Sequence, residues 1–241
     1  MKSIIITGAS RGIGASTALL LAEKYDYMAI CSHSSPDALN TIKAEVEKKN
    51  CICRAFMGDV SDYSFAADLV SNVIKDAGHI DVLINNAAIS TVGLFTDMKP
   101  EEWHRIIDIN LNSLYNMCHN VVPHMVHEHS GRIINISSVW GLVGASCEVA
   151  YSATKGAVNS FSKALAKELA PSHISVNAIA FGAVDTSMNS HLSEDELNAL
   201  CDEIPYGKMA TSEEAAMCIG HVIDMPSYLT GEVIKFDGAW I

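Results

Sequence analysis

The stretch TGASRGIG, residues 7–14, decides how the rest of the chain is interpreted. It follows the short apolar segment SIIIT and leads into the apolar stretch ASTALLLAEKY. Glycines in such a turn let the backbone approach a ligand and let a helix pack closely on a strand. The following helix offers N–H groups and the positive end of its dipole to an anion. A strand, a glycine turn and a helix in this order predict a dinucleotide-binding site, which is expected to include Gly8, Ser10, Arg11, Gly12, Ile13 and Gly14.

The rest of the chain alternates short apolar or β-branched runs with amphipathic stretches. Nearly continuous apolar strands are typical of a parallel sheet that helices cover on both faces. The predicted strands lie at 3–7, 27–31, 51–57, 81–85, 132–137, 174–180 and 232–237. The predicted helices lie near 12–25, 36–49, 61–78, 100–127, 150–170 and 212–225. The alternation predicts a Rossmann-like, doubly wound α/β fold with a seven-stranded parallel sheet.

The chain contains no linker or shift in composition, so a single domain over residues 1–241 is predicted. The stretch 186–211 fits no strand–helix unit, and we interpret it as a mobile, partly helical substrate lid.

Charge and composition exclude several classes of protein. The chain has 16 Lys and Arg against 28 Asp and Glu, a net charge of −12, with no basic run, which argues against nucleic-acid binding. No apolar run is long enough for a membrane span. The apolar run within the first ten residues, MKSIIITGAS, is too short for the core of a signal peptide. Seven cysteines without a CxxC motif indicate reduced thiols and a cytoplasmic protein.

A tyrosine and a lysine lie four positions apart in EVAYSATKGAV, residues 148–158. On a helix Tyr151 and Lys155 would share one face, about 6 Å apart. By itself such a pair also fits a partly buried tyrosine beside a solvated lysine. Tyrosine has a pKa near 10, but a neighbouring cation would favour the phenolate and lower that value. Tyr151 could then exchange a proton with a carbonyl or alcohol oxygen.

Several motifs together resemble those of the short-chain dehydrogenase/reductase family. The spacing Gly8-x3-Gly12-x-Gly14 is the pattern of that family, and NNAA at 85–88 is similar to its NNAG, with Ala88 in place of glycine. The resemblance implies a nicotinamide-dependent interconversion of a ketone and an alcohol. It also implies a catalytic tetrad of Asn110 in DINLNS, Ser138 in INISSVWG, Tyr151 and Lys155.

The resemblance assigns a role to each member of the tetrad. Ser138 would donate a hydrogen bond to the substrate oxygen and stabilise the charge that develops there. Lys155 would tune Tyr151, together with the positive nicotinamide, and would also bind the nicotinamide ribose. Asn110 would hold a water that links Lys155 to solvent.

Further cofactor contacts follow from the same resemblance. GDV at 58–60 matches the adenine site, with Asp59 facing the amino group of the ring. FGAVDTSM at 181–188 is similar to the PGxxxT segment of the family, with Phe181 in place of proline, so a less rigid loop is expected there. The remaining contacts that the resemblance implies are Val60, Asn86, Ala87, the Val184 backbone and the Thr186 hydroxyl.

The end of the second predicted strand favours NADP(H) over NAD(H). Enzymes of this type that use NAD usually carry an acidic residue there, bonded to the ribose hydroxyls. In AICSHSSPD no acid precedes Asp37. The side chains of Ser32, His33 and Ser34 would not repel a 2′-phosphate, and Arg11 adds a cation.

The greatest overall likeness is to 3-oxoacyl-acyl-carrier-protein reductases, in GRIINISSVWG, KALAKELAP and YLTGEVIKFDGAW. A 3-oxoacyl thioester is therefore the preferred substrate. However, MVHEHSGR and APSHIS carry histidines and serine where cations that dock an acidic carrier protein are expected. The alternative substrates are a small ketone, a coenzyme A thioester or a sterol of the kind that hydroxysteroid dehydrogenases use. The stretch SSVWGLVGASCEVAYSATKGAVNSF also resembles reductases of the 5-aminopentanone modification of elongation factor P. The residues expected to flank the substrate are Ser138, Trp140, Cys147, Phe181 and Met188.

Three further expectations concern a metal, the assembly and the class of protein. His119, His124, His127 and His129 do not converge on one helix face, so no metal site is predicted. The resemblance implies a homotetramer. A protein of another class, a non-catalytic NADP(H)-binding sensor, is disfavoured because such proteins tend to lose the tyrosine or the lysine.

Overall fold

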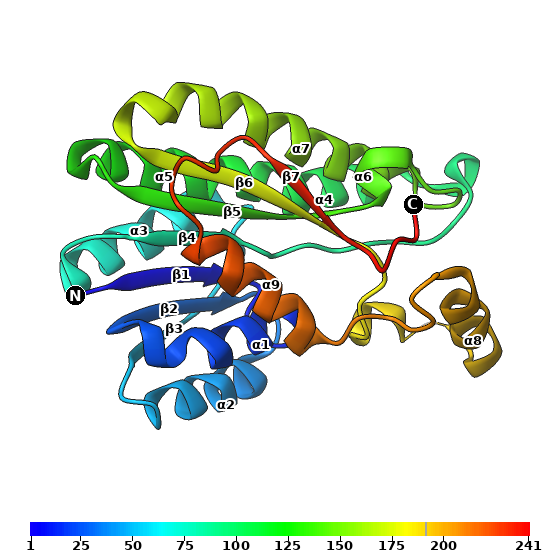
Figure 1. Cartoon of the computed structure of the whole chain (residues 1–241), viewed down its shortest axis with the longest axis horizontal. Coiled ribbons are helices and arrows are strands. Elements are labelled where there is room, and N and C mark those ends of the chain that lie inside the picture. The colour runs from blue at the N-terminus through cyan, green and yellow to red at the C-terminus, as the bar shows by residue number, and fades with distance from the viewer. Residues whose placement is uncertain (191) are drawn as a thin grey trace.

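The fold is built on one sheet of seven parallel strands, and every predicted strand lies within one residue of its observed bounds. The computed structural model describes residues 1–190 and 192–241. Figure 1 shows the strands running side by side, in the order β3-β2-β1-β4-β5-β6-β7. The strands are β1 Ser3–Thr7, β2 Tyr27–Ser32, β3 Ile52–Met57, β4 Val82–Asn85, β5 Gly131–Ser138, β6 Ile174–Phe181 and β7 Val233–Phe236.

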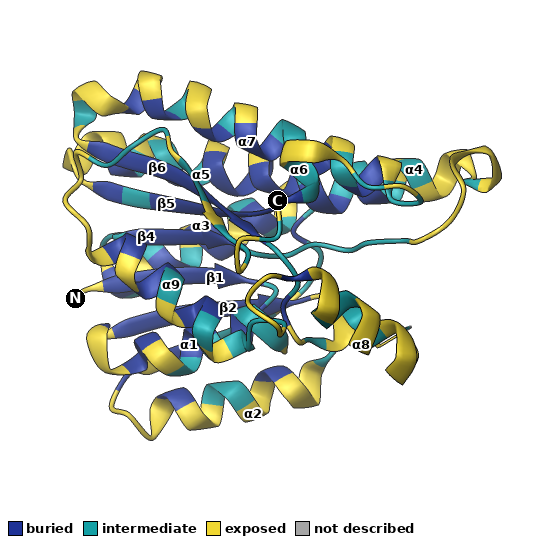
Figure 2. Cartoon of the chain, turned by 45° about the vertical axis from the view of Figure 1, so that its right-hand side comes forward, coloured by how far each residue is buried: buried dark blue, intermediate teal, exposed yellow. Residues whose placement is uncertain are grey.

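The side chains of β1 alternate between two apolar layers, as a buried strand requires. Ile4 and Ile6 pack into one cluster of buried residues and Ile5 packs into the other. The first layer is made by α1 Gly12–Leu21, α2 Pro36–Glu47 and α9 Ser212–Asp224. The second is made by α3 Tyr63–Ala77, α5 Ser113–Glu128 and α7 Val149–Leu169. Figure 2 shows the buried strands between these two layers of helices.

The strand order reverses next to β1, and this reversal places the ligand site. From β1 the chain adds β2 and β3 on one side, then returns to add β4 on the other. The connections leaving the carboxyl ends of β1 and β4 therefore diverge and open a crevice at this edge of the sheet. Thr7 and Asn85, the last residues of these two strands, mark its floor.

The predicted helix at 100–127 is interrupted by a turn of wider pitch. Its first part is α4 Pro100–Ile107, and a π-helical turn, η3 Asp108–Asn112, joins it to α5. The hydroxyl of Ser113 donates to the carbonyl of Ile109 within this turn. Such local widening is frequent at functional sites. Its consequence here is that Asn110 lies in the π-helical turn, where it is buried.

Short elements complete the chain. The helix α6 Trp140–Val143 follows β5, and α8 Glu194–Glu203 is set apart from the sheet in Figure 1. None of the residues of α8 is buried. The 3-10 helices are η1 Ala22–Lys24, η2 Phe95–Asp97, η4 Ala170–Ser172 and η5 Ser187–Asn189. No helix in the described part of the chain has the length and apolar character that crossing a bilayer needs.

Candidate active site

The glycine turn after β1 has no room for side chains. Gly8 has a φ of 66°, and a Cβ there would lie 2.8 Å from Cα of Ala87. A Cβ on Gly14 would lie 2.4 Å from the carbonyl oxygen of Gly8. No side chain caps the N-terminus of α1, and no acidic residue occupies its first turn. The backbone N–H groups of this turn are therefore available to an anion, and the turn fits a dinucleotide pyrophosphate.

Side chains from two strand ends hold this turn in place. Oγ1 of Thr7 accepts the N–H groups of Asn86 and Ala87 at 2.9 and 3.0 Å. The amide of Asn86 in turn donates to the carbonyl oxygens of Thr7 and Gly8, at 2.9 and 3.0 Å. The NNAA segment thus fixes the backbone that would face the phosphates.

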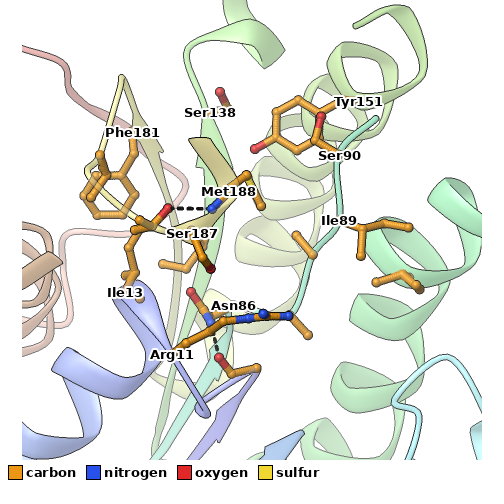
Figure 3. A pocket seen from close by; sticks show the side chains of 18 of the residues that line it. Arg11, Ile13, Asn86, Ile89, Ser90, Ser138, Tyr151, Phe181, Ser187 and Met188 are labelled. Carbon is orange, nitrogen blue, oxygen red and sulfur yellow. Dashed lines mark hydrogen bonds between the residues drawn. The ribbon is translucent and has the colours of Figure 1, made fainter. Parts of the chain in front are cut away.

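A cavity of about 930 Å³ opens at the crevice. In Figure 3 Arg11 and Asn86 lie on one side of it, while Ser138 and Tyr151 lie on the opposite side. Of the site residues predicted from the sequence, all except Gly14, Asn110 and Cys147 line this cavity. Cys147 lies instead in a turn with a φ of 62°, where its carbonyl accepts the N–H of Gly93 at 2.9 Å. The backbone role of Cys147 in this turn explains why its side chain is outside the cavity lining.

Three polar side chains meet at the inner end of the cavity. Ser138 ends β5, and Tyr151 and Lys155 lie one turn apart on α7. Nζ of Lys155 lies 5.5 Å from the centre of the Tyr151 ring and donates to the carbonyl oxygen of Ile136 at 2.8 Å. Tyr151 is 9% exposed and Lys155 is 3% exposed. The two side chains are thus held together out of bulk water.

Burial controls the protonation of this pair. It raises the pKa of Tyr151 well above its ordinary value, the carboxylate of Glu148 raises it further, and a hydrogen bond with Ser138 lowers it in part. Burial also lowers the pKa of Lys155 to about 8. The sequence predicted that Lys155 would lower the pKa of Tyr151, but in the chain itself desolvation of the phenol and the charge of Glu148 raise it. Tyr151 is protonated at neutral pH, like a tyrosine in water, and burial holds the proton more tightly.

A glycine allows α6 to approach the catalytic helix. A Cβ on Gly141 would lie 2.5 Å from the backbone carbonyl carbon of Lys155. The carbonyl of Gly141 accepts a hydrogen bond of 3.1 Å from the Asn159 amide, one turn further along α7. This contact positions the backbone of Lys155 against the segment that follows Ser138.

Asn110 joins the loop after β4 to the catalytic helix. Its Oδ1 accepts the N–H of Ile89, and its Nδ2 donates to the carbonyl of Ile89 and to Oγ1 of Thr154, at 2.8, 2.8 and 3.2 Å. Thr154 donates to the carbonyl of Tyr151 at 2.7 Å. Both amide hydrogens of Asn110 are therefore used for positioning. That it also supports a water relay stays a prediction.

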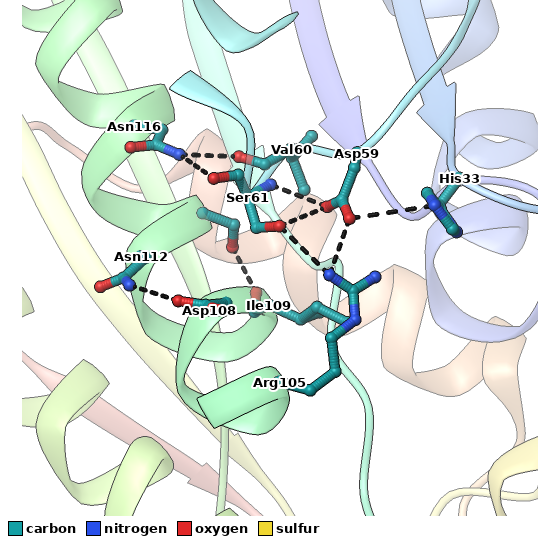
Figure 4. Close-up of polar contacts among 10 residues, drawn as sticks. His33, Asp59, Val60, Ser61, Arg105, Asp108, Ile109, Asn112 and Asn116 are labelled. Atoms are coloured by element: carbon teal, nitrogen blue, oxygen red, sulfur yellow. Dashed lines mark hydrogen bonds and ion pairs between the residues drawn. The ribbon is translucent and has the colours of Figure 1, made fainter. Parts of the chain in front are cut away.

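An ion pair occupies the far end of the cavity, at the ends of β2 and β3 (Figure 4). Nη1 of Arg105 lies 2.8 Å from Oδ2 of Asp59, and the backbone and hydroxyl of Ser61 donate to Oδ1 at 2.9 and 2.7 Å. Nε2 of His33 lies 3.9 Å from the same carboxylate. Partial burial would raise the pKa of Asp59, but the hydrogen bonds from Ser61 and Arg105 outweigh it and lower that pKa.

Several residues that line the cavity lie outside the motifs recognised in the sequence. Arg105 comes from α4, and Trp240 comes from the C-terminal segment to stack against Trp140, with ring centres 4.8 Å apart. Glu148 lies three residues before Tyr151, so helical spacing alone could have placed it on the same face. The others that line the cavity without being predicted include Ser90, Leu192 and Leu200.

Among the histidines of α5, His119 contacts a tyrosine of α3. Nδ1 of His119 lies 2.9 Å from the hydroxyl of Tyr63. Within residues 1–190 and 192–241, no three histidine, cysteine or acidic side chains are grouped as a metal site needs.

Substituting Gly14 with alanine should weaken dinucleotide binding. The added methyl would overlap the carbonyl of Gly8 and the amide of Asn86, at 2.4 and 2.6 Å, so the turn has to open. Overpacking of this kind costs about 1–3 kcal/mol, and it falls on the backbone that faces the phosphates. We expect at least about tenfold weaker binding of a reduced nicotinamide dinucleotide, measured by fluorescence titration. Gly93→Ala is the control, because no atom lies within 4 Å of that Cβ position and the residue does not line the cavity. Unchanged affinity in Gly14→Ala would mean that the turn does not hold the cofactor.

Comparison with known proteins agrees with this geometry. The family model described as short chain dehydrogenase matches residues 2–197. A 3-oxoacyl-[acyl-carrier-protein] reductase of Thermotoga maritima is 36% identical over 241 residues, covering 100% of this chain and 98% of that protein. The corresponding reductase of Chlamydia muridarum is 37% identical over 238 residues, with coverage of 98% and 96%. An uncharacterized oxidoreductase of Bacillus subtilis is 36% identical over 241 residues, with coverage of 99% and 98%. The chain therefore belongs to the short-chain dehydrogenase family and is an oxidoreductase.

Proposed function

We propose that this protein is an NADP(H)-dependent reductase that converts a ketone to a secondary alcohol, and that a 3-oxoacyl thioester is its substrate. The observation that carries the proposal is the buried, protonated phenol of Tyr151 between Ser138 and Lys155, at the inner end of the cavity. The likeness to 3-oxoacyl-[acyl-carrier-protein] reductases, at 36% and 37% identity, supports the choice of substrate.

The residues of the cavity fit the parts of a nicotinamide dinucleotide. The cradle at Gly8 and Gly14, which a Cβ would fill, suits a pyrophosphate. Asp59 and Val60 would hold the adenine, and Lys155 the nicotinamide ribose. The backbone of Val184 and the hydroxyl of Thr186 would bind the carboxamide. The other residues assigned to the cofactor are Ser10, Arg11, Gly12, Ile13, Ser32, His33, Ser34, Asn86 and Ala87.

The residues at the inner end would supply the acid chemistry. A bound reduced nicotinamide supplies the hydride. Tyr151, whose phenol carries its proton at neutral pH, donates that proton to the carbonyl oxygen of the substrate. Ser138 donates a hydrogen bond to the same oxygen and stabilises the negative charge that develops on it. Lys155 favours the phenolate that Tyr151 becomes, because a cation stabilises a neighbouring anion. Asn110 acts as a positioning residue through Thr154 and Ile89.

The end of β2 supports NADP(H) as the cofactor. Ser32 donates to the hydroxyl of Ser10 in the glycine turn at 3.0 Å, and no acidic side chain from β2 lines the cavity. The carboxylate that does lie nearby, Asp59, is already paired with Arg105. Arg11 is exposed and lines the cavity, where it adds a cation for a 2′-phosphate.

Placing a carboxylate at the end of β2 should reverse the preference for the cofactor. In Ser32→Asp the new charge would repel a 2′-phosphate and would accept hydrogen bonds from free ribose hydroxyls. We expect the ratio of kcat/KM for NADPH to that for NADH to fall about 100-fold, which is roughly 2.7 kcal/mol. Ser32→Ala, which removes the bond to Ser10 without adding charge, should change this ratio little. An unchanged ratio in Ser32→Asp would place the 2′-phosphate elsewhere.

The stretch 186–211 would act as a lid over the substrate. It supplies Met188, Leu192 and Leu200 to the cavity, and with Trp140 and Phe181 these make an apolar wall. Such a wall excludes water from the reacting carbonyl and suits an acyl chain. We further propose that the protein is a cytoplasmic homotetramer, on the strength of its resemblance to the family.

The proposed function is tested by the consumption of NADPH with acetoacetyl-coenzyme A, with NADH and a ketosteroid measured alongside. Rapid oxidation of NADPH with the thioester is expected. Activity with the steroid alone would contradict the proposal that the substrate is a 3-oxoacyl thioester. Activity with NADH alone would contradict the proposal that the cofactor is NADP(H). If no ketone is reduced with either cofactor, the proposed reaction itself is wrong.

A further inference from the structure

A carboxylate shares the catalytic face of α7. Glu148 precedes Tyr151 by three residues and Lys155 by seven, so the three side chains follow one helix face, and all three line the cavity. Glu148 stands at the N-terminal end of α7, yet its side chain makes no capping hydrogen bond there. Its Oε2 instead accepts the hydroxyl of Ser90, from the loop after β4, at 2.7 Å. This bond fixes the carboxylate beside the catalytic phenol.

The charge of Glu148 is not neutralised within the described part of the chain. Among the described residues, two carboxylates line the cavity, those of Asp59 and Glu148. Asp59 is paired with Arg105, whereas no lysine, arginine or histidine among the described residues lies within 4.0 Å of the Glu148 carboxylate. The field of Glu148 reaches the phenol of Tyr151, since it is among the causes that raise its pKa. A substrate at this phenol therefore meets the carboxylate of Glu148 as well as the ammonium of Lys155, which lies 5.5 Å from the centre of the Tyr151 ring.

Two indoles form part of the wall of the same cavity. The rings of Trp140 and Trp240 lie 4.8 Å apart and are tilted by 60°. The C-terminal segment that carries Trp240 is fixed by Asp237, whose carboxylate accepts the N–H groups of Ala239 and Ile241, both at 3.1 Å. Indole faces attract cations, and the Glu148 carboxylate that lines the same cavity adds an ionic partner. Together they are the set of groups that recognises an ammonium ion.

We propose that the ketone substrate of this protein carries an ammonium group beyond its carbonyl, and that Glu148 is the residue that selects it. This inference rests on the proposed ketone reduction and narrows its substrate to amino ketones, free or held as a thioester. The carbonyl oxygen would meet Tyr151 and Ser138, while the ammonium would meet Glu148 and the indole wall. A carboxylate at the same place on the substrate would be repelled.

The test compares two ketones of the same shape. One is a straight-chain methyl ketone that ends in a trimethylammonium group, and the other ends in a neutral tert-butyl group. The wild type should reduce the ammonium ketone with a kcat/KM at least about tenfold higher. Equal values for the two ketones would overturn the inference and leave the proposed ketone reduction intact. If neither ketone nor acetoacetyl-coenzyme A is reduced, both the function and the inference fail.

Two variants test whether the preference for the ammonium ketone comes from the charge of Glu148. Glu148→Gln keeps the size of the side chain and an acceptor for Ser90 but removes the charge, so the ratio between the two ketones should fall to the smaller part that the indoles supply. Ser90→Ala removes the hydrogen bond and keeps the charge, so most of the preference should remain. Because each result is a ratio within one variant, a general loss of activity cancels. An undiminished preference in Glu148→Gln would overturn the role of Glu148.

A binding measurement makes the result independent of turnover. The alcohols that correspond to the two ketones are titrated with the NADP⁺-loaded protein, and indole fluorescence is followed. Tighter binding of the ammonium alcohol by the wild type is expected, and the difference between the two alcohols should be much smaller in Glu148→Gln. Equal binding of both alcohols by the wild type would contradict the inference.

Discussion

Replacing Tyr151 with phenylalanine is expected to lower kcat about 10²–10⁴-fold while NADP(H) still binds with nearly unchanged affinity. The phenol is the proton donor to the reacting oxygen in the proposed mechanism, and it carries its proton at neutral pH. Phenylalanine fills the same space, so the contact of the ring with Lys155, at 5.5 Å, can persist. The rate of NADPH oxidation and a separate cofactor titration distinguish chemistry from binding.

Tyr25→Phe is a matched control for this experiment. Tyr25 is 4% exposed, its hydroxyl has no hydrogen-bond partner among the described residues, and it does not line the catalytic cavity. Burial raises the pKa of its phenol too. Removing this hydroxyl should change turnover less than about twofold, because an unpaired buried polar group contributes no interaction to lose. If Tyr151→Phe also kept its turnover, Tyr151 would have no place in the mechanism.

The sheet could be predicted from the sequence because its central strands are buried on both faces. A run such as SIIIT is apolar on both faces of the strand, so its limits are set by polar residues and glycines at the ends. The interruption of the helix at 100–127 could not be predicted in this way. A π-helical turn has no distinct composition, and its position depends on Asn110 binding to Ile89 and Thr154, which are distant in the sequence.

In the cavity, too, some residues could be predicted from local sequence patterns and others could not. The glycine turn and the Tyr151–Lys155 pair are local patterns whose spacing indicates their chemistry. Arg105 and Trp240 reach the cavity only through the packing of α4 and of the C-terminal segment, so no local pattern marks them. The direction of the Tyr151 pKa also required the structure. Spacing shows that a cation is near, but the depth of burial determines whether desolvation or charge attraction is larger.

The burial of Lys155 should lower the free energy of unfolding of the protein, although the mechanism needs this lysine. Its pKa falls from an ordinary value of 10.5 to about 8 in the folded protein. Below that pH the lysine is charged in both states, and the folded state carries the full desolvation cost. Between about 8 and 10.5 the unfolded chain keeps the proton that the folded one has lost, so the free energy of unfolding rises with pH. Above 10.5 both forms are neutral and the cost is gone.

Lys155→Met should therefore stabilise the cofactor-free protein at neutral pH while it abolishes activity. A shift from 10.5 to about 8 corresponds to roughly 3 kcal/mol, and the lost hydrogen bond to Ile136 offsets about 1 kcal/mol of this. The expected gain is about 2 kcal/mol in the free energy of unfolding by urea at pH 7. The difference between variant and wild type should shrink as pH rises from about 8 to 10.5.

An exposed lysine of the same helix provides the control for this prediction. Lys167 lies on the solvent side of α7, and Lys167→Met should change stability by less than about 0.5 kcal/mol at every pH. A Lys155→Met protein that is less stable than the wild type, or whose difference does not vary with pH, would show that Lys155 keeps its ordinary pKa. A stabilised and inactive variant would instead mean that the fold tolerates a destabilising buried cation because catalysis requires it.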